Sequence, residues 1–217
     1  MLKNYKWKYG DSWEKYPIKP GHIWGETTTN SKFTVHDIMT DPPPFIWPAT
    51  LVYCDPPWNL GNVNSFVTKN NSNNYIENFQ QFYDSLFAWI EWVHPDICYL
   101  EIGKQHLKDF QFEMKKIFSS VQTWEITYYK KNPCYLVRGG ILPTDFNYSG
   151  KDDNETPYLA IQNENHNCIA DFCTGRGLTA ISAFKLGKQF LGTELNAHRL
   201  AVTIDKIAQL GGKFEVL

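Results

Sequence analysis

Short apolar runs alternate with longer amphipathic stretches along most of the chain. The apolar runs favour strands at residues 32–37, 50–54, 96–101, 122–129, 168–172 and 189–193. Helical spacing of apolar residues predicts helices at 77–93, 104–118, 178–186 and 197–210. This alternation is typical of an α/β sandwich, in which helices cover both faces of a mostly parallel sheet.

Residues 1–32 show no such period and are expected to form an irregular N-terminal arm before a single domain at 33–217. Two interpretations of the arm remain open, of which the first is favoured. Its aromatic residues could pack it over the domain. Alternatively, its interleaved cations and tryptophans could contact nucleic acid or a partner, the residues concerned being Lys3, Lys6, Trp7, Lys8 and Trp13.

Two further stretches break the alternation. Residues 59–74 are rich in Asn and Gly, and residues 132–155 contain Pro133, Pro143 and a pair of glycines. Such compositions are typical of turns and loops. We therefore expect two long mobile loops there, and long loops in a compact domain are often functional.

Composition narrows the class of protein. The chain has 217 residues, of which 42% are hydrophobic and 20% are charged. One compact domain of this size buries enough surface to fold without a disulfide or a structural metal. The formal net charge of −2 argues against a strongly basic nucleic-acid coat protein, although a local basic groove stays open.

The apolar runs, cysteines and histidines indicate where the protein is located and whether it binds a metal. No run of 18 apolar residues occurs, and the first residues lack the apolar stretch of a signal peptide, so no membrane association is expected. The five cysteines are odd in number and include no C-x-x-C pair, which favours reduced thiols and a cytoplasmic location. Because the six histidines form no spaced cluster with them, no metal site is expected.

The first candidate motif is Asp55-Pro56-Pro57-Trp58, directly after the predicted strand LVYC. In an open α/β sheet, ligands bind at the carboxyl ends of the strands. The two prolines restrict the backbone, so the Asp55 carboxylate and the Pro56 carbonyl can offer two fixed acceptors to one NH₂ group. Trp58 adds a flat stacking surface. The motif therefore suits a planar base with an exocyclic amine, against the plainer reading of a turn with an N-capping Asp.

The second motif, Asp171-Phe172-Cys173-Thr174-Gly175-Arg176-Gly177, also follows a strand and opens a helix. Its glycines let a backbone approach a ligand closely. The next predicted strand ends at Glu194-Leu195, where an acid is placed to bind two ribose hydroxyls. A tight turn is the plainer reading of the glycines alone. The three-glycine dinucleotide fingerprint is absent, which disfavours a pyrophosphate ligand.

Together these motifs resemble the S-adenosylmethionine-dependent amino-methyltransferases that act on exocyclic amines of bases. The order, with D-P-P-W before the cofactor turn, resembles the permuted β-class, which includes bacterial and phage DNA methyltransferases and RNA adenine enzymes. The resemblance covers roughly residues 33–210. It implies a Rossmann-like methyltransferase sandwich that uses S-adenosylmethionine.

The resemblance also implies roles for individual residues. The catalytic set would be Asp55, Pro56, Pro57 and Trp58, which hold the target amine and stack on the base. The cofactor-binding set would be Asp37, Asp55, Asp171, Phe172, Cys173, Thr174, Gly175, Gly177, Glu194 and Leu195. The segment WEITYYKKNP resembles the wall of the base pocket. One departure is the turn itself, which reads D-F-C-T-G-R-G where the family more often has D-P-F-x-G-S-G.

The substrate expected from this resemblance is the N6 amine of adenine in nucleic acid, with DNA favoured over RNA and cytosine N4 as the alternative base. Candidate nucleic-acid contacts are Asn59, Lys130, Lys131 and Arg138. Only about two dozen residues separate Lys131 from Thr156, too few for a separate target-recognition domain. The three arginines offer few readers of guanine. We therefore expect low or partner-supplied sequence specificity.

Other readings stay open. The chain could be a non-catalytic cofactor-binding subunit of a heteromeric methyltransferase, or a homodimer could supply what one copy lacks. Methylation of a protein side-chain amide is disfavoured, because the enzymes that perform it typically carry Asn-Pro-Pro-Tyr. The abundance of Asn and Lys with little Arg is typical of an A/T-rich genome, such as that of a phage or a low-GC bacterium.

Overall fold

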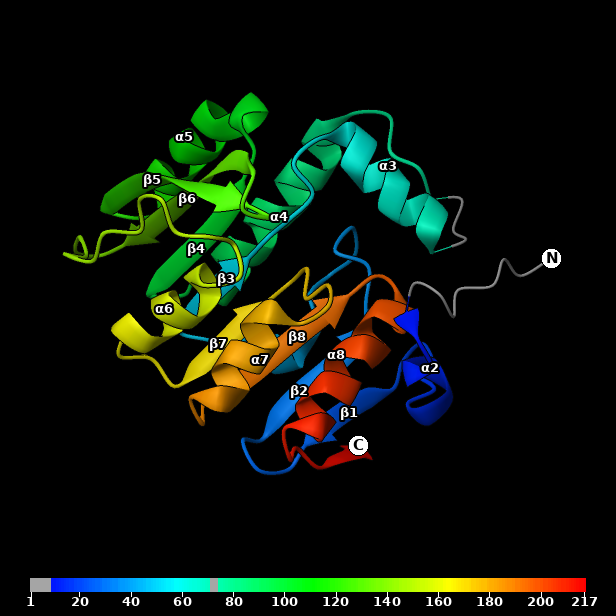
Figure 1. Cartoon of the computed structure of the whole chain (residues 1–217). Helices are drawn as coiled ribbons and strands as arrows, with labels where there is room; N and C mark the ends of the chain where they lie inside the picture. Colours follow the sequence, from blue (N-terminus) through cyan, green and yellow to red (C-terminus); the bar gives the residue numbers. More distant parts are fainter. Residues whose placement is uncertain (1–8, 71–73) are drawn as a thin grey trace.

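The computed structural model describes residues 9–70 and 74–217. In this part of the chain one nine-stranded sheet has the order β5-β6-β4-β3-β7-β8-β2-β1-β9 (Figure 1). The strands are β1 Ile23–Glu26, β2 Ser31–Val35, β3 Leu51–Cys54, β4 Ile97–Ile102, β5 Ser120–Tyr128, β6 Asn132–Gly140, β7 Cys168–Asp171, β8 Gln189–Glu194 and β9 Phe214–Val216. The five central strands pair in parallel, from β4 to β2, which confirms the predicted α/β class.

Helices cover both faces of this sheet. They are α2 Ser12–Lys15, α3 Leu60–Lys69, α4 Phe79–Val93, α5 Leu107–Ile117, α6 Thr156–Asn163, α7 Leu178–Lys185 and α8 Ala197–Gln209, with short 3₁₀ turns at Pro44–Ile46 and Lys104–His106. The predicted helices at 77–93, 104–118, 178–186 and 197–210 correspond to α4, α5, α7 and α8.

The two hydrophobic cores lie on opposite sides of the sheet. On β3, Leu51 and Tyr53 face the core under α6, α7 and α8, whereas Val52 and Cys54 face the core under α4 and α5. Every residue of β3 and β4 is buried. Such double burial is expected of central parallel strands and explains why their sequences read as unbroken apolar runs.

The expectation of a loop at 59–74 is wrong for residues 60–69, which form α3. The Asn59 side chain accepts a hydrogen bond from the Asn62 backbone N–H at 3.0 Å and so caps the helix. Val63 and Val67, four residues apart, bury one helical face. The stretch is therefore a capped amphipathic helix in spite of its many asparagines. Residues 71–73 lie outside the described part of the chain.

The expectation of a loop at 132–155 is also wrong in its first third. Residues 132–140 form β6, which pairs with β5 on one side and β4 on the other. Pro133 lies near the start of the strand, and Leu136 and Val137 are fully buried. Only 141–155 are a connecting loop, and α6 follows it.

From residue 9 on, the N-terminal arm packs on the domain, in agreement with the favoured interpretation that its aromatic residues pack it there. Ser12 donates a hydrogen bond to Asp205 at 2.9 Å, and the Trp13 ring lies 4.6 Å from that of His198. However, the arm is not irregular to residue 32, because Ile23–Glu26 form β1, between β2 and β9. Lys3, Lys6, Trp7 and Lys8 lie outside the described residues.

The connections diverge between β3 and β7. From β3 the chain continues to its neighbour β4, whereas from β7 it continues to β8 on the opposite side. The carboxyl ends of β3 and β7 therefore lie at a topological switch point, where open α/β sheets bind their ligands.

Candidate active site

A cavity of about 360 Å³ opens at the carboxyl ends of the central strands. This size suits one small ligand. Its lining includes most of the residues predicted from the sequence, namely Asp37, Asp55, Pro56, Pro57, Trp58, Asp171, Phe172, Cys173, Thr174, Gly175, Glu194 and Leu195. The structure thus brings together both motifs, although 116 positions separate Asp55 from Asp171 (171 − 55).

Trp58 is fixed beside Asp55. Its indole N–H donates to Asp55 Oδ1 at 3.1 Å and to the carbonyl oxygen of Glu101 at 3.2 Å. The ring also meets Tyr128 edge-on, with 4.9 Å between centroids. A side chain at Gly103 would bring its Cβ to 2.8 Å from the indole, so this glycine leaves room for Trp58. The aromatic surface at the end of β3 is therefore preorganised.

The Asp55 carboxyl is open to solvent through the cavity, yet protein atoms surround it. This desolvation raises its pKa to about 7, and the negative charge of Asp171 adds to the rise. The hydrogen bond from Trp58 acts in the opposite direction, because it stabilises the carboxylate. Asp55 therefore changes charge near neutral pH.

The turn after β7 is held by its own backbone. Asp171 Oδ1 accepts from the Cys173 N–H at 2.9 Å, and Gly175 lies in the left-handed region with φ +59°. Gly177, with φ +84°, does not line the cavity: a Cβ there would come within 2.5 Å of Thr203 on α8. Its role is to let the turn and α8 approach closely. Burial raises the pKa of Asp171 to about 7.

Glu194 joins this turn to the end of β8. Its Oε2 accepts from the Gly175 N–H at 2.8 Å, and its Oε1 accepts from the Asn196 N–H at 2.9 Å. The carboxylate is buried and keeps further lone pairs for a ligand. The acid predicted at the second strand end is thus in place beside the glycine turn.

Several residues that line the cavity were not found by sequence reasoning: Tyr53, Phe66, Glu101, Asp153 and Arg199. Glu101 ends a predicted strand as Asp55 does, so the same rule could have found it. Phe66 and Arg199 come from α3 and α8, and the guanidinium lies 4.7 Å from the ring centroid. Asn196 also donates to the Lys69 carbonyl at 3.1 Å. Helix α3 therefore bounds the cavity and contacts the start of α8.

Of the candidate nucleic-acid contacts, Asn59 and the two lysines differ in their surroundings, and Arg138 differs from all three. Asn59 is the N-cap of α3. Lys130 and Lys131 are exposed at the turn of the β5–β6 hairpin, next to Tyr128 and Tyr129 in the cavity wall, as expected for WEITYYKKNP.

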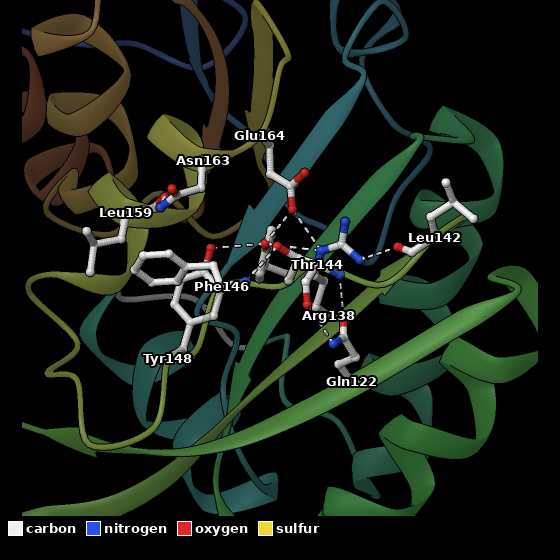
Figure 2. A network of polar contacts seen from close by, with 10 residues as sticks. Gln122, Arg138, Leu142, Thr144, Phe146, Tyr148, Leu159, Asn163 and Glu164 are labelled. Carbon is white, nitrogen blue, oxygen red and sulfur yellow. Dashed lines mark hydrogen bonds and ion pairs between the residues drawn. The ribbon is translucent and has the colours of Figure 1, made fainter.

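The expectation for Arg138 is wrong, because its side chain is buried and already paired (Figure 2). Its Nε donates to Glu164 at 2.8 Å, and a terminal N–H donates to the Leu142 carbonyl at 2.8 Å. Nearby, the Gln122 side chain bonds both the N–H and the carbonyl of Thr144. These bonds hold the loop that carries Asp153 to the cavity.

Across the described ranges, no helix has the length and apolar character to cross a membrane. In the same ranges, no group of three or more His, Cys, Asp or Glu side chains is arranged to hold a metal ion.

Comparison with known proteins supports the fold. No protein-family model and no curated protein matches the chain. Among solved structures, M1.HpyAVI is 12% identical with a TM-score of 0.56, covering 81% of this chain and 97% of that one. TTHA0409 from Thermus thermophilus, complexed with S-adenosyl-L-methionine, is 15% identical with a TM-score of 0.55, covering 82% and 93%. PvuII DNA methyltransferase (cytosine-N4-specific) is 11% identical with a TM-score of 0.55, covering 88% and 95%. At these identities the likeness establishes a shared fold.

Proposed function

We propose that this protein transfers a methyl group from S-adenosylmethionine to the exocyclic N6 amine of adenine in DNA. The observation that carries the proposal is the meeting of two motifs across one switch point. Asp55-Pro56-Pro57-Trp58 ends β3, the glycine turn follows β7, and both line a single cavity. The solved structures of this fold with S-adenosyl-L-methionine or with the name DNA methyltransferase support the proposal.

The residues of the cavity fit S-adenosylmethionine. Glu194 ends β8 and Asp37 lies two residues after the end of β2, and their carboxylates suit the ribose hydroxyls and the adenine amine. Asp171 and Asp55 offer negative charge toward a cationic ligand, and Arg199 offers positive charge toward a carboxylate. S-adenosylmethionine, when bound, supplies the methyl group, which is attached to a positively charged sulfur.

The chain's own residues then act on the amine. In our proposal the ionised Asp55 and the Pro56 carbonyl accept hydrogen bonds from the two N–H groups and orient the nitrogen lone pair. Trp58 and Tyr128 give the base an aromatic wall. The work is mainly positioning and electrostatics, and the surplus proton of the methylated amine leaves to water or to Asp55.

Cytosine N4 is the second candidate base. The neighbour whose name states cytosine-N4 specificity favours it, and both bases present an amine to the same acceptors. Low or partner-supplied sequence specificity is part of the proposal, because the buried Arg138 leaves Arg176 and Arg199 as the arginines open to a ligand.

One experiment tests reaction, base and substrate class together. Purified protein is incubated with S-adenosylmethionine and separate pools of duplex DNA, single-stranded DNA and RNA. Each pool is digested to nucleosides and analysed by mass spectrometry. N6-methyldeoxyadenosine in a DNA pool is expected, N4-methyldeoxycytidine supports the second candidate, and a methylated RNA pool overturns the choice of DNA. Cofactor binding with no methylation of any pool supports a non-catalytic subunit instead.

Asp55→Ala removes one of the two acceptors for the amine. We expect methylation to fall by about a hundredfold to a thousandfold, because the loss of one preorganised hydrogen-bonding group has an effect of this order on a rate. Binding of S-adenosylmethionine, measured by calorimetry, should weaken but persist, because Asp37, Asp171 and Glu194 still line the cavity. Asp145→Ala, at an exposed carboxylate outside the cavity lining, is the matched control and should keep full activity. Normal methylation by the Asp55 variant would contradict the proposal.

A further inference from the structure

Glu101 lies level with Asp55 at the carboxyl end of the sheet. The parallel pairing of β3 and β4 sets Cys54 opposite Leu100, so the next residues along the two strands, Asp55 and Glu101, are neighbours. The two aromatic rings one pleat earlier, Tyr53 and Tyr99, stack with centroids 5.8 Å apart. Alternate residues of a strand share a face, so Asp55 and Glu101 project on the side of these rings.

One oxygen of Glu101 is satisfied by protein and the other is not. Oε2 accepts from the Tyr53 hydroxyl at 3.1 Å and lies 3.5 Å from the Thr156 hydroxyl. Oε1 has no hydrogen-bond partner within the ranges 9–70 and 74–217, although the residue is only 1% exposed and lines the cavity. A buried polar atom without a partner is costly, which points to a ligand group that completes it.

The surroundings favour the neutral acid. Burial, with the negative charges of Asp55 and Asp153, raises the pKa of Glu101 well above its usual range. The titratable and polar groups that face it come from β3, β5, β6 and the segment before and within α6: Tyr53, Asp55, Tyr128, Cys134, Asp153 and Thr156. Because Oε2 accepts from hydroxyls, the proton of the neutral acid belongs on Oε1.

We propose that Glu101 reads the target base by donating the hydrogen of Oε1 to the ring nitrogen beside the exocyclic amine. The inference rests on the proposed function and deepens it. Asp55 and the Pro56 carbonyl accept from the amine, while Glu101 donates to its neighbour. Adenine N1 and cytosine N3 both match this pattern. Thymine presents the reverse one, a carbonyl beside an N–H, and is excluded.

The test compares two analogues of adenine in one reaction. Random single-stranded oligonucleotides carry natural bases together with equal amounts of 1-deazaadenine and 7-deazaadenine. Only the first analogue lacks the nitrogen assigned to Glu101. We expect the wild-type protein to methylate 7-deazaadenine about fivefold or more above 1-deazaadenine, since a lost base contact costs about 1 kcal/mol or more. If the natural target is cytosine, 3-deazacytosine is compared with cytosine in the same way.

Three variants separate a contact from a structural effect. Glu101→Gln keeps a donor of the same shape and should keep the discrimination. Glu101→Leu should lose it, so that the two analogues are methylated within about twofold of each other relative to natural adenine. Glu125→Leu, at an exposed glutamate of β5, is the matched control and should behave as wild type.

The outcomes distinguish this inference from the function on which it rests. If wild-type protein methylates no natural base in any pool, the proposed function fails and the assignment of Glu101 fails with it. If natural adenine is methylated and both analogues follow it equally, the methyltransferase stands and the Glu101 contact is overturned. The wild-type comparison needs no variant, so a Glu101 variant that does not fold leaves this decision intact.

Discussion

Asp55 follows β3 and Asp171 ends the adjacent β7, and the pKa of each is raised to about 7, by the protein atoms around the carboxyl of the solvent-accessible Asp55 and by burial of Asp171. Each carboxyl also accepts a hydrogen bond from its own turn, Asp55 from Trp58 and Asp171 from the Cys173 N–H. These bonds stabilise the ionised form but do not offset the desolvation. At the residue scale the site is therefore a pair of acids whose charge changes across the neutral range.

The rate of the proposed methyl transfer should rise with pH between about pH 6 and pH 7. In the proposed mechanism Asp55 accepts from the amine most strongly when it is ionised, and with a pKa of about 7, about a tenth of it is ionised at pH 6 and half at pH 7. We expect kcat/KM for the nucleic acid to increase about fivefold between these values. Rates at several S-adenosylmethionine concentrations, extrapolated to the cofactor-free protein to which this pKa belongs, check it, with cofactor binding measured separately because Asp171 titrates in the same range. A flat or falling profile from pH 6 to 7 would contradict the role of Asp55.

Residue types at strand ends made most of the site predictable. Asp55, Asp171 and Glu194 were found because each acid directly follows or ends an apolar run. Arg138 was misassigned because its partner Glu164 lies 26 positions away, and a buried ion pair of that separation leaves no local pattern. The unsatisfied oxygen of Glu101 is likewise a property of packing and was beyond the sequence.

At the scale of elements, α3 is the clearest difference between expectation and structure. Its many asparagines indicated a loop, but one of them is a cap, and Val63 with Val67 supplies the buried face. The strongly periodic helices were placed closely: 197–210 was expected, and α8 spans Ala197–Gln209. Short elements such as β1 and β9 were missed, since three or four residues carry too little periodicity to be recognised.

Removal of the α3 cap should loosen the wall of the cavity. Asn59→Ala removes the acceptor for the Asn62 N–H, and such a loss costs about 1 kcal/mol of helix stability. We expect amide hydrogen exchange in residues 60–69 to accelerate about fivefold while the central strands keep their rates. Asn59→Ser retains a capping oxygen and is the matched control. Equal exchange in both variants would show that the cap does not stabilise α3.

The ion pair of Arg138 should matter for stability rather than for nucleic-acid affinity. Arg138→Ala leaves the nearly buried Glu164 without its cationic partner, with a hydrogen bond from the Tyr99 hydroxyl remaining, and frees the Leu142 carbonyl (Figure 2). Breaking a buried pair on one side costs about 3 kcal/mol or more. Urea unfolding measures this change, and Lys131→Ala at an exposed position should alter stability by less than about 0.5 kcal/mol. Equal stability of the two variants would refute the structural role.

At the scale of the whole molecule, a net charge of −2 gives no general attraction for DNA, so the proposed DNA binding depends on local cations beside the cavity. Lys130 and Lys131 follow the aromatic wall directly. Their placement could be predicted as far as the end of a strand, because the predicted strand at 122–129 is followed by two lysines, but the hairpin to β6 was not expected. Their proximity to the cavity depends on the sheet order, which no local pattern reveals.

The double variant Lys130→Ala/Lys131→Ala should weaken the salt dependence of DNA binding. Each phosphate contact contributes about 0.9 to the slope of log K against log salt concentration, so we expect the slope for duplex DNA to decrease by up to about 1.8. Titrations at several salt concentrations measure it. The matched control is Lys108→Ala/Lys115→Ala on α5, whose lysines are exposed and outside the cavity lining. An unchanged slope in the first variant would remove the hairpin from the binding surface.

The strand order also determines when the sheet can be completed during synthesis. β3 ends at Cys54 and must wait for β7, which begins at Cys168, and β2 must wait for β8. The interval of 114 residues (168 − 54) takes the ribosome roughly 6–23 s. Throughout this time one edge of β3 and one edge of β2 present unpaired backbone groups, the kind of edge that recruits other strands. A nascent chain of this protein therefore keeps two strand edges open to mispairing until β7 and β8 emerge.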